Sequence, residues 1–264
     1  MRHLTIADVP MTRATLTDNG GNTLGAAWKV DGENVDKATY LNLSEVLQTN
    51  FRYGDLKASN SGSTAAFTGD VWCRNLDKLA ILYPTRVVFG TNGSYTITLD
   101  GQDGTLDKLA QQFHYVYGVG EVTVDNDNPV NASGTISSMK SLLAACKFTF
   151  KDGSGNAIPV KTLSIGYGNA SVGYPMTATV VPSTTEFGNV KLIPANPIAN
   201  DLLTVTLPAT VTTDSVYLAL FPVSEKSGFY FSVTDNNDDT YTGTAQAKLL
   251  AGRYYPVELK LTKN

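Results

Sequence analysis

Cysteine, histidine and charged residues are all scarce in this chain, and each scarcity argues against a class of function. Of 264 residues, two are Cys and two are His, and charged residues make up 17%. The net charge of −4 argues against nucleic acid as a partner, because binding to phosphate depends on many Lys and Arg contacts. No apolar run approaches the length of a membrane helix, so we expect no transmembrane segment.

Motifs of catalytic sites are also missing. The chain has no G-x-S-x-G, H-E-x-x-H or G-x-x-x-x-G-K, and no G-x-G-x-x-G between a strand and a helix. Of the two histidines, His3 lies near the start of the sequence and His114 lies in QQFHYVYG, where a packed or exposed ring is favoured over a catalytic base. The sequence therefore predicts a protein that is not an enzyme and has no cofactor.

Metal sites are disfavoured by spacing. Cys73 and Cys146 lie in apolar stretches with no second Cys or His at ligand spacing, which favours free thiols over a disulfide and over a metal site. The acidic runs 125–128 and 235–239 offer calcium two sets of oxygen ligands, but Val130 and Thr240 stand where an EF-hand loop needs Gly. Solvated turns are the favoured interpretation of both runs.

Alternating patterns of apolar and polar residues dominate what is present. In the last run, Tyr255, Val257, Leu259 and Leu261 share one face, which is typical of a half-buried strand. Similar short runs, separated by turns rich in Gly, Asn and Asp, recur along the chain: TRATLT, AAFTGDVW, LAILY, YTITL, KTLSIGY, TATVV, NVKLI, LLTVTLP, SVYLALFP and FYFSV. This pattern predicts an all-β protein built from antiparallel β-sandwiches.

Turns and short helices interrupt the strands. The segment Thr91-Asn92-Gly93-Ser94 is the strongest hairpin signal, and Thr105 is placed to cap a short helix over residues 106–113. Met139, Leu142, Leu143 and Cys146 fit one more helical turn. The loop-like stretch DNDNPVNASG (125–134) predicts a domain boundary, giving an N-terminal domain over 1–135 and a C-terminal domain over 136–264.

Several blocks of the sequence, in this order, resemble the fimbrillin family of Bacteroidetes, which comprises the FimA-like and Mfa-like pilins and their accessory lipoproteins. The blocks span nearly the whole chain: TRATLT, Trp28, LDKLAILYP, YTITLDGQDGTLDKL, HYVYGVGEVTV, SSMKSLLAACKFTF, VYLALFPVSEKSGFYFSV and LLAGRYYPVELKLTK. The resemblance implies two tandem transthyretin-like sandwiches in an exported lipoprotein. Its location would be the cell surface, the outer membrane or a fimbrium, and its signal and lipid-anchor segment are taken as removed from this chain.

The resemblance also implies a function in adhesion and in fimbriae, with an open choice between stalk, tip and anchor. In pilins of this family an arginine-specific protease cuts an N-terminal loop, and the vacated groove accepts a strand from another fimbrial subunit by β-strand addition. Arg13-Ala14 best matches such a processing site, and Leu4, Ile6 and Val9 would lie on the removable strand. The alternative is that Arg13 is an ordinary strand residue.

The aromatic residues leave a second function open, which is the binding of sugars. Trp28, Trp72 and thirteen tyrosines could form a stacking platform for sugars, as in a carbohydrate-binding surface lipoprotein of a glycan-uptake system. Most of these residues lie within strand-like runs, where an aromatic side chain more often packs in the core. The sequence names neither a host or bacterial receptor nor a glycan.

Overall fold

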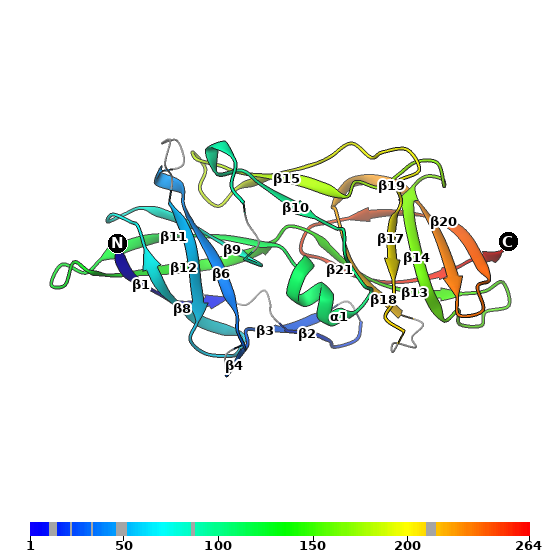
Figure 1. Cartoon of the computed structure of the whole chain (residues 1–264), viewed down its shortest axis with the longest axis horizontal. Coiled ribbons are helices and arrows are strands. Elements are labelled where there is room, and N and C mark those ends of the chain that lie inside the picture. The colour runs from blue at the N-terminus through cyan, green and yellow to red at the C-terminus, as the bar shows by residue number, and fades with distance from the viewer. Residues whose placement is uncertain (11–14, 22, 33, 46–51, 86–87, 210–214) are drawn as a thin grey trace.

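The computed structural model describes the whole chain except residues 11–14, 22, 33, 46–51, 86–87 and 210–214. Strands dominate it, so the prediction of an all-β protein is confirmed. A closed barrel forms one end of the elongated molecule and holds the N-terminus, while packed sheets form the other end and hold the C-terminus (Figure 1).

The barrel contains seven strands in the order β1-β12-β11-β9-β6-β7-β8. Their bounds are β1 (Arg2–Pro10), β6 (Lys37–Asn42), β7 (Tyr53–Ala58), β8 (Thr64–Val71), β9 (Lys78–Tyr83), β11 (Val116–Val124) and β12 (Asn131–Ser141). Apolar side chains from every strand fill the interior together with Trp28, which lies between β3 and β4. Trp28, Tyr40 and Phe67 are the largest side chains of this core that are less than 2% exposed. The ring closes where β7 pairs with β8 through Lys57 opposite Thr68 and Ala58 opposite Phe67, so each barrel strand has a neighbour on both sides.

Three sheets build the second half. One has five strands: β17 (Leu203–Thr206), β14 (Val160–Tyr167), β19 (Val223–Asp235), β20 (Thr240–Leu249) and β22 (Thr262–Lys263). The other two have three strands each: β18 (Ser215–Leu220), β13 (Ala144–Lys151) and β21 (Tyr254–Lys260), and β10 (Tyr95–Thr98), β15 (Thr177–Pro182) and β16 (Val190–Pro194).

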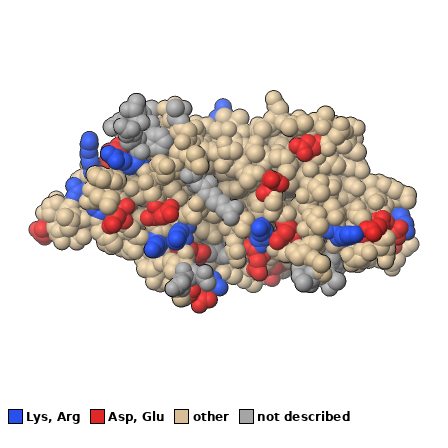
Figure 2. Space-filling view, in the orientation of Figure 1, with Lys and Arg blue, Asp and Glu red and all other residues tan. Residues whose placement is uncertain are grey.

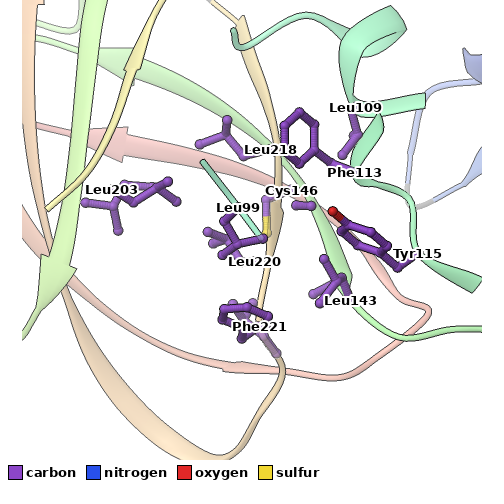
Figure 3. Close-up of a cluster of buried hydrophobic side chains, with 14 of the residues drawn as sticks. Leu99, Leu109, Phe113, Tyr115, Leu143, Cys146, Leu203, Leu218, Leu220 and Phe221 are labelled. Atoms are coloured by element: carbon purple, nitrogen blue, oxygen red, sulfur yellow. The ribbon is translucent and has the colours of Figure 1, made fainter. Parts of the chain in front are cut away.

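Two of these sheets pack face to face across a continuous apolar core. Phe148 of β13 lies against Phe231 of β19, with ring centroids 5.4 Å apart. The same cluster includes Cys146, Leu218 and Phe221, whose side chains converge in Figure 3. Sheet-on-sheet packing explains why residues of β13 alternate between buried and half-buried.

The remaining elements are short. Two hairpins are formed by β2 (Thr15–Asp18) with β3 (Leu24–Ala27) and by β4 (Val30–Asp31) with β5 (Asn34–Val35). The helical elements are η1 (Leu43–Glu45), η2 (Thr91–Gly93), α1 (Leu106–Lys108) and η3 (Leu109–Phe113). The Thr105 side chain accepts a hydrogen bond from the Lys108 main-chain N–H, so the predicted cap of α1 is confirmed.

The structure corrects two expectations. The sheets are not wholly antiparallel, because β1 runs parallel to β12 and β13 runs parallel to β21. The helical turn expected from Met139, Leu142, Leu143 and Cys146 is wrong, since these residues lie in or between β12 and β13. Only four residues show the helical spacing, and hydrogen bonding to neighbouring strands outweighs so weak a preference.

The expected domain boundary stays a prediction. Strand β12 runs across residues 135 and 136, and β10, which precedes this point in the sequence, pairs with β15 of the second half. The turn before β10 is present as expected, because Asn92 and Gly93 both have positive φ and the Gly90 N–H donates to the Ser94 carbonyl.

The outer edge of β18 is capped by a side chain. Gln102 Oε1 accepts from the Ala219 N–H at 2.7 Å, and Gln102 Nε2 donates to the Ala219 carbonyl at 3.1 Å. The Tyr217 N–H, which is the next outward-facing donor on this edge, donates to the Gly104 carbonyl at 2.8 Å. The Gln102 amide therefore replaces a neighbouring strand at a buried position.

We expect Gln102→Leu to lower the free energy of unfolding by about 3 kcal/mol, because it leaves a buried N–H and a buried carbonyl of Ala219 unpaired. Denaturant titration followed by circular dichroism measures this change. Gln111→Leu is the matched control, since Gln111 is exposed. Equal stability of the two variants would contradict the capping role of Gln102.

Candidate functional site

Strand β1 closes the barrel and is the element that the sequence singled out for removal. It pairs in parallel with β12, where Leu4 lies opposite Ala132, and antiparallel with β8, where Leu4 lies opposite Gly69. Leu4, Ile6 and Val9 are 0%, 3% and 0% exposed and belong to the barrel core. The sequence had assigned these three side chains to a removable strand, and all three point inward from one strand.

A bulge in β1 explains the spacing of its buried residues. The register against β8 shifts between Ile6 and Val9, and Asp8 adopts a left-handed backbone with φ of 49°. An extra residue at a bulge lets Val9, rather than Asp8, face the core. Asp tolerates this conformation better than most residues with a Cβ.

Contacts at both ends hold β1 in place. The His3 N–H donates to the Val130 carbonyl at 2.8 Å, and Arg2 Nε donates to the Cys73 carbonyl at 3.1 Å. At the other end, the indole Nε1 of the buried Trp28 donates to the Val9 carbonyl at 3.3 Å. The first strand is thus fastened along its length and at its ends.

Removing β1 would leave a slot, meaning the space between β8 and β12 that β1 occupies. Burying Leu4, Ile6 and Val9 contributes on the order of 6 kcal/mol. Loss of β1 would also expose the facing main-chain groups of β8 and β12, which would then be open for pairing with another chain. Such a slot would offer two rows of main-chain groups and the apolar pockets vacated by alternate side chains of β1.

The hairpin that follows β1 is attached to the other half of the molecule. Asp18, at the end of β2, accepts hydrogen bonds at Oδ2 from Lys147 Nζ at 2.9 Å, Tyr217 OH at 2.9 Å and Tyr254 OH at 3.1 Å. These three donors lie on β13, β18 and β21, one on each strand of the sheet. The hydrogen bond from Lys147 is the main cause that lowers the pKa of the Asp18 carboxyl to about 2, against the opposing effect of burial.

The proposed processing site itself, Arg13 and Ala14, lies outside the described residues. The strands on either side are described: β1 ends at Pro10 in the barrel core, and β2 begins at Thr15. Since β2 is held by Asp18, a cut between the two strands would leave β1 attached only by non-covalent contacts. The role of Arg13-Ala14 stays a prediction.

The other candidates from the sequence do not gather at one place. Trp28 is buried in the barrel, whereas Trp72 is 46% exposed and carries the Arg52 guanidinium 4.6 Å from its ring centroid. His114 is half-buried, and its Nε2 lies 2.7 Å from Ser141 Oγ. Cys73 and Cys146 are free thiols in two different clusters, half-buried and buried respectively.

The two acidic runs form turns. Asp235 Oδ1 accepts from the main-chain N–H groups of Asn237 and Asp239, and Asp125 Oδ1 accepts from those of Asp127 and Asn128. Within the described ranges, no three His, Cys, Asp or Glu side chains come together as a metal site. None of the helices in the described part of the chain has the length and apolar character needed to span a bilayer.

The sequence did not reveal the contacts that matter most around β1. Asp18 forms a local turn, since its Oδ1 accepts from the Gly20 N–H. Its three partners on the second half lie 129 to 236 residues away along the chain. No local pattern marks such a contact.

Comparison with known proteins finds relatives in structure only. No protein-family model matches the chain, and no curated protein matches it. Among solved structures, a "putative cell adhesion protein" from Bacteroides uniformis ATCC 8492 aligns with a TM-score of 0.60 and 12% identity, covering 100% of this chain and 96% of that chain. Another with this description, from Bacteroides ovatus ATCC 8483, aligns with a TM-score of 0.57 and 15% identity over 100% and 96%.

A third structure extends the same pattern. It is described as a "putative cell adhesion protein" from Bacteroides fragilis NCTC 9343 and aligns with a TM-score of 0.52 and 11% identity, covering 100% of this chain and 97% of that chain. The likeness is one of fold. It extends over the barrel and the packed sheets together, since each alignment covers the whole of this chain.

We expect Asp18→Asn to lower the free energy of unfolding by about 1 to 2 kcal/mol at pH 7, because the depressed pKa reflects favourable interactions of the ionised carboxylate in the folded state. In the wild type this contribution is complete above the unfolded pKa of about 3.9. It is lost as the pH falls toward about 2, the folded value.

Denaturant titration at pH 7, 4 and 2.5 measures this dependence. Asp201→Asn is the control, because Asp201 is exposed. If the difference between wild type and Asp18→Asn is the same at pH 7 and pH 2.5, the assignment of the ionised carboxylate is wrong.

Proposed function

We propose that this chain is a non-enzymatic protein of the bacterial cell surface that serves in adhesion or in the assembly of fimbriae. The observation that carries the proposal is the alignment of the whole chain with two Bacteroides structures described as putative cell adhesion proteins, at TM-scores of 0.60 and 0.57. The scarcity of charge, seen on the face drawn in Figure 2, suits a protein that contacts other surfaces through neutral side chains.

Assembly by strand exchange is the mechanism that the resemblance to fimbrillins implies. In this proposal, cleavage after Arg13 frees β1, and the slot between β8 and β12 accepts a strand from another subunit. The inward-facing Leu4, Ile6 and Val9 support it, since an incoming strand needs apolar side chains at matching positions. A lipid-anchored form in the outer membrane, two transthyretin-like domains and a boundary after residue 135 belong to the same proposal.

Cleavage at Arg13 is directly testable with the full chain and an arginine-specific protease. We expect a product that begins at Ala14, seen by mass spectrometry, and oligomer ladders on a native gel. Arg13→Lys is the matched control, because it keeps the positive charge and removes the recognised residue. A ladder of the same strength from Arg13→Lys, or no ladder from the cleaved wild type, would rule out this mechanism.

A synthetic peptide of residues 2–10 tests whether the subunits join through the slot between β8 and β12. Added in excess during cleavage, it should refill the slot and suppress the ladder, because its Leu4, Ile6 and Val9 match the vacated pockets. The twin peptide with Ile6→Asp should have no effect, since a carboxylate cannot be buried there without a partner. Equal suppression by both peptides would count against exchange through this slot.

A carbohydrate-binding role is the second candidate, and one observation favours it. Trp72 is 46% exposed, and the Arg52 guanidinium stacks on its ring, as in a platform for an acidic sugar. Screening the wild type and Trp72→Ala on a glycan array tests this role. Binding that Trp72→Ala does not weaken would remove the basis for it.

A further inference from the structure

A wide groove lies at the junction of the two halves, well apart from β1. It has a volume of about 1170 Å³ and is lined by residues of β2 and β3, by His114, by the end of β12, by neighbouring residues of β13 and by the turn into β21. No residue of β1 lines it. We call it the junction groove.

One wall of the junction groove is the open edge of β21. The Ala145 N–H donates to the Arg253 carbonyl, and the Leu261 N–H donates to the Lys151 carbonyl. β13 and β21 are parallel, so these two bonds fix which residues of β21 point their main-chain groups at β13, namely Tyr255, Val257 and Leu259. The alternate residues Tyr254 and Pro256 therefore point their main-chain groups away from β13. Both of these outward residues line the groove.

The two edges of this sheet are treated differently. On β18, the outward groups of Tyr217 and Ala219 are taken up by Gly104 and by the Gln102 side chain. On β21, nothing in the described residues pairs with the outward edge. Pro256 has no N–H, so the outward main-chain groups of β21 that line the groove are the N–H of Tyr254 and the carbonyls of Tyr254 and Pro256.

A second strand edge that has no partner strand among the described residues belongs to β3. The Asn19 N–H donates to the Thr23 carbonyl, and this bond fixes the alternation along the β2–β3 pair. Leu24 and Ala26 therefore turn their main-chain N–H and C=O groups away from β2. Leu24 and Ala26 also line the junction groove, so strand edges border it on two sides.

The side chains of the junction groove add charge and apolar surface. Lys140 and Arg253 lie on its wall, and no Asp or Glu is among the described residues that line it, although the chain as a whole is acidic. Leu16, Leu24 and Leu143 supply apolar surface between the cations. An occupant with a carboxylate beside apolar side chains would match this lining.

We propose that the junction groove binds a short extended peptide of a partner protein, with apolar residues at alternate positions and one acidic residue, by strand addition to β21 and β3. An extended peptide is favoured over an acidic polysaccharide because only a polypeptide backbone offers the alternating N–H and C=O groups that two strand edges need. Binding at the junction groove needs no cleavage and no release of β1, so this proposal is independent of the proposed strand exchange.

The test uses the uncut full chain and a set of nine-residue peptides in which valine, isoleucine or tyrosine alternates with threonine around a central aspartate. We expect saturable binding by fluorescence anisotropy, and a twin set with lysine in place of the aspartate should bind about tenfold more weakly. Hydrogen exchange should show new protection at the outward amides of Leu24, Ala26 and Tyr254.

Variants separate main-chain pairing from charge. Ala26→Pro removes an outward N–H that the β2–β3 pair does not use. This variant should bind the peptides about tenfold more weakly, with an unchanged melting temperature. Ala26→Val keeps the N–H and should bind like the wild type. Arg253→Glu should weaken the aspartate peptides about tenfold, and Lys226→Glu, an exposed site elsewhere, should not.

Three results would overturn the proposal. The first is no binding of any aspartate peptide up to about 1 mM, the weak end of specific affinities. The second is equal binding of the aspartate and lysine sets. The third is binding of polygalacturonate with the same Arg253 dependence but without protection at the three amides, which would make the junction groove a site for acidic glycans.

Discussion

Unpaired main-chain groups at the edges of sheets are the constraint on which this structure depends. A chain in which strands dominate must satisfy every N–H and C=O that it buries, and each open sheet ends in two rows of such groups. The barrel has no such end rows because its strands form a closed ring, in which β1 lies between β8 and β12. In the sheet of β18, β13 and β21, Gln102 and Gly104 pair with the edge of β18, and no described residue pairs with the outward edge of β21.

The same constraint connects fold with function. A strand that completes a barrel is held by its ladder and by its buried side chains, so whatever displaces it must supply both. β1 has these two kinds of contact and an additional bond from Trp28 to the Val9 carbonyl. The Asp18 contacts bind the next hairpin to the other half, so the chain on the two sides of residues 11–14 is held by different parts of the molecule.

Much of the local structure could be predicted from patterns of a few residues. The strand at 254–260, the cap at Thr105 and the turn at 235–239 follow from alternation, capping and turn chemistry. The predicted helical turn around Met139 is wrong, because Met139 pairs with Gly118 of β11 and Cys146 pairs with β18 and β21 on its two sides.

The sequence by itself determined that this protein is all-β, where most of its strands and turns lie, and which side chains of β1 face a core. These are properties of short segments, set by side-chain periodicity and by the backbone preferences of Gly, Asn and Asp. Only the tertiary structure decided that β1 runs parallel to β12, that Asp18 reaches Lys147, Tyr217 and Tyr254, and that two open edges border one groove. Those features depend on contacts between segments far apart in the chain. A local pattern does not specify which distant segment a strand pairs with, or in which register.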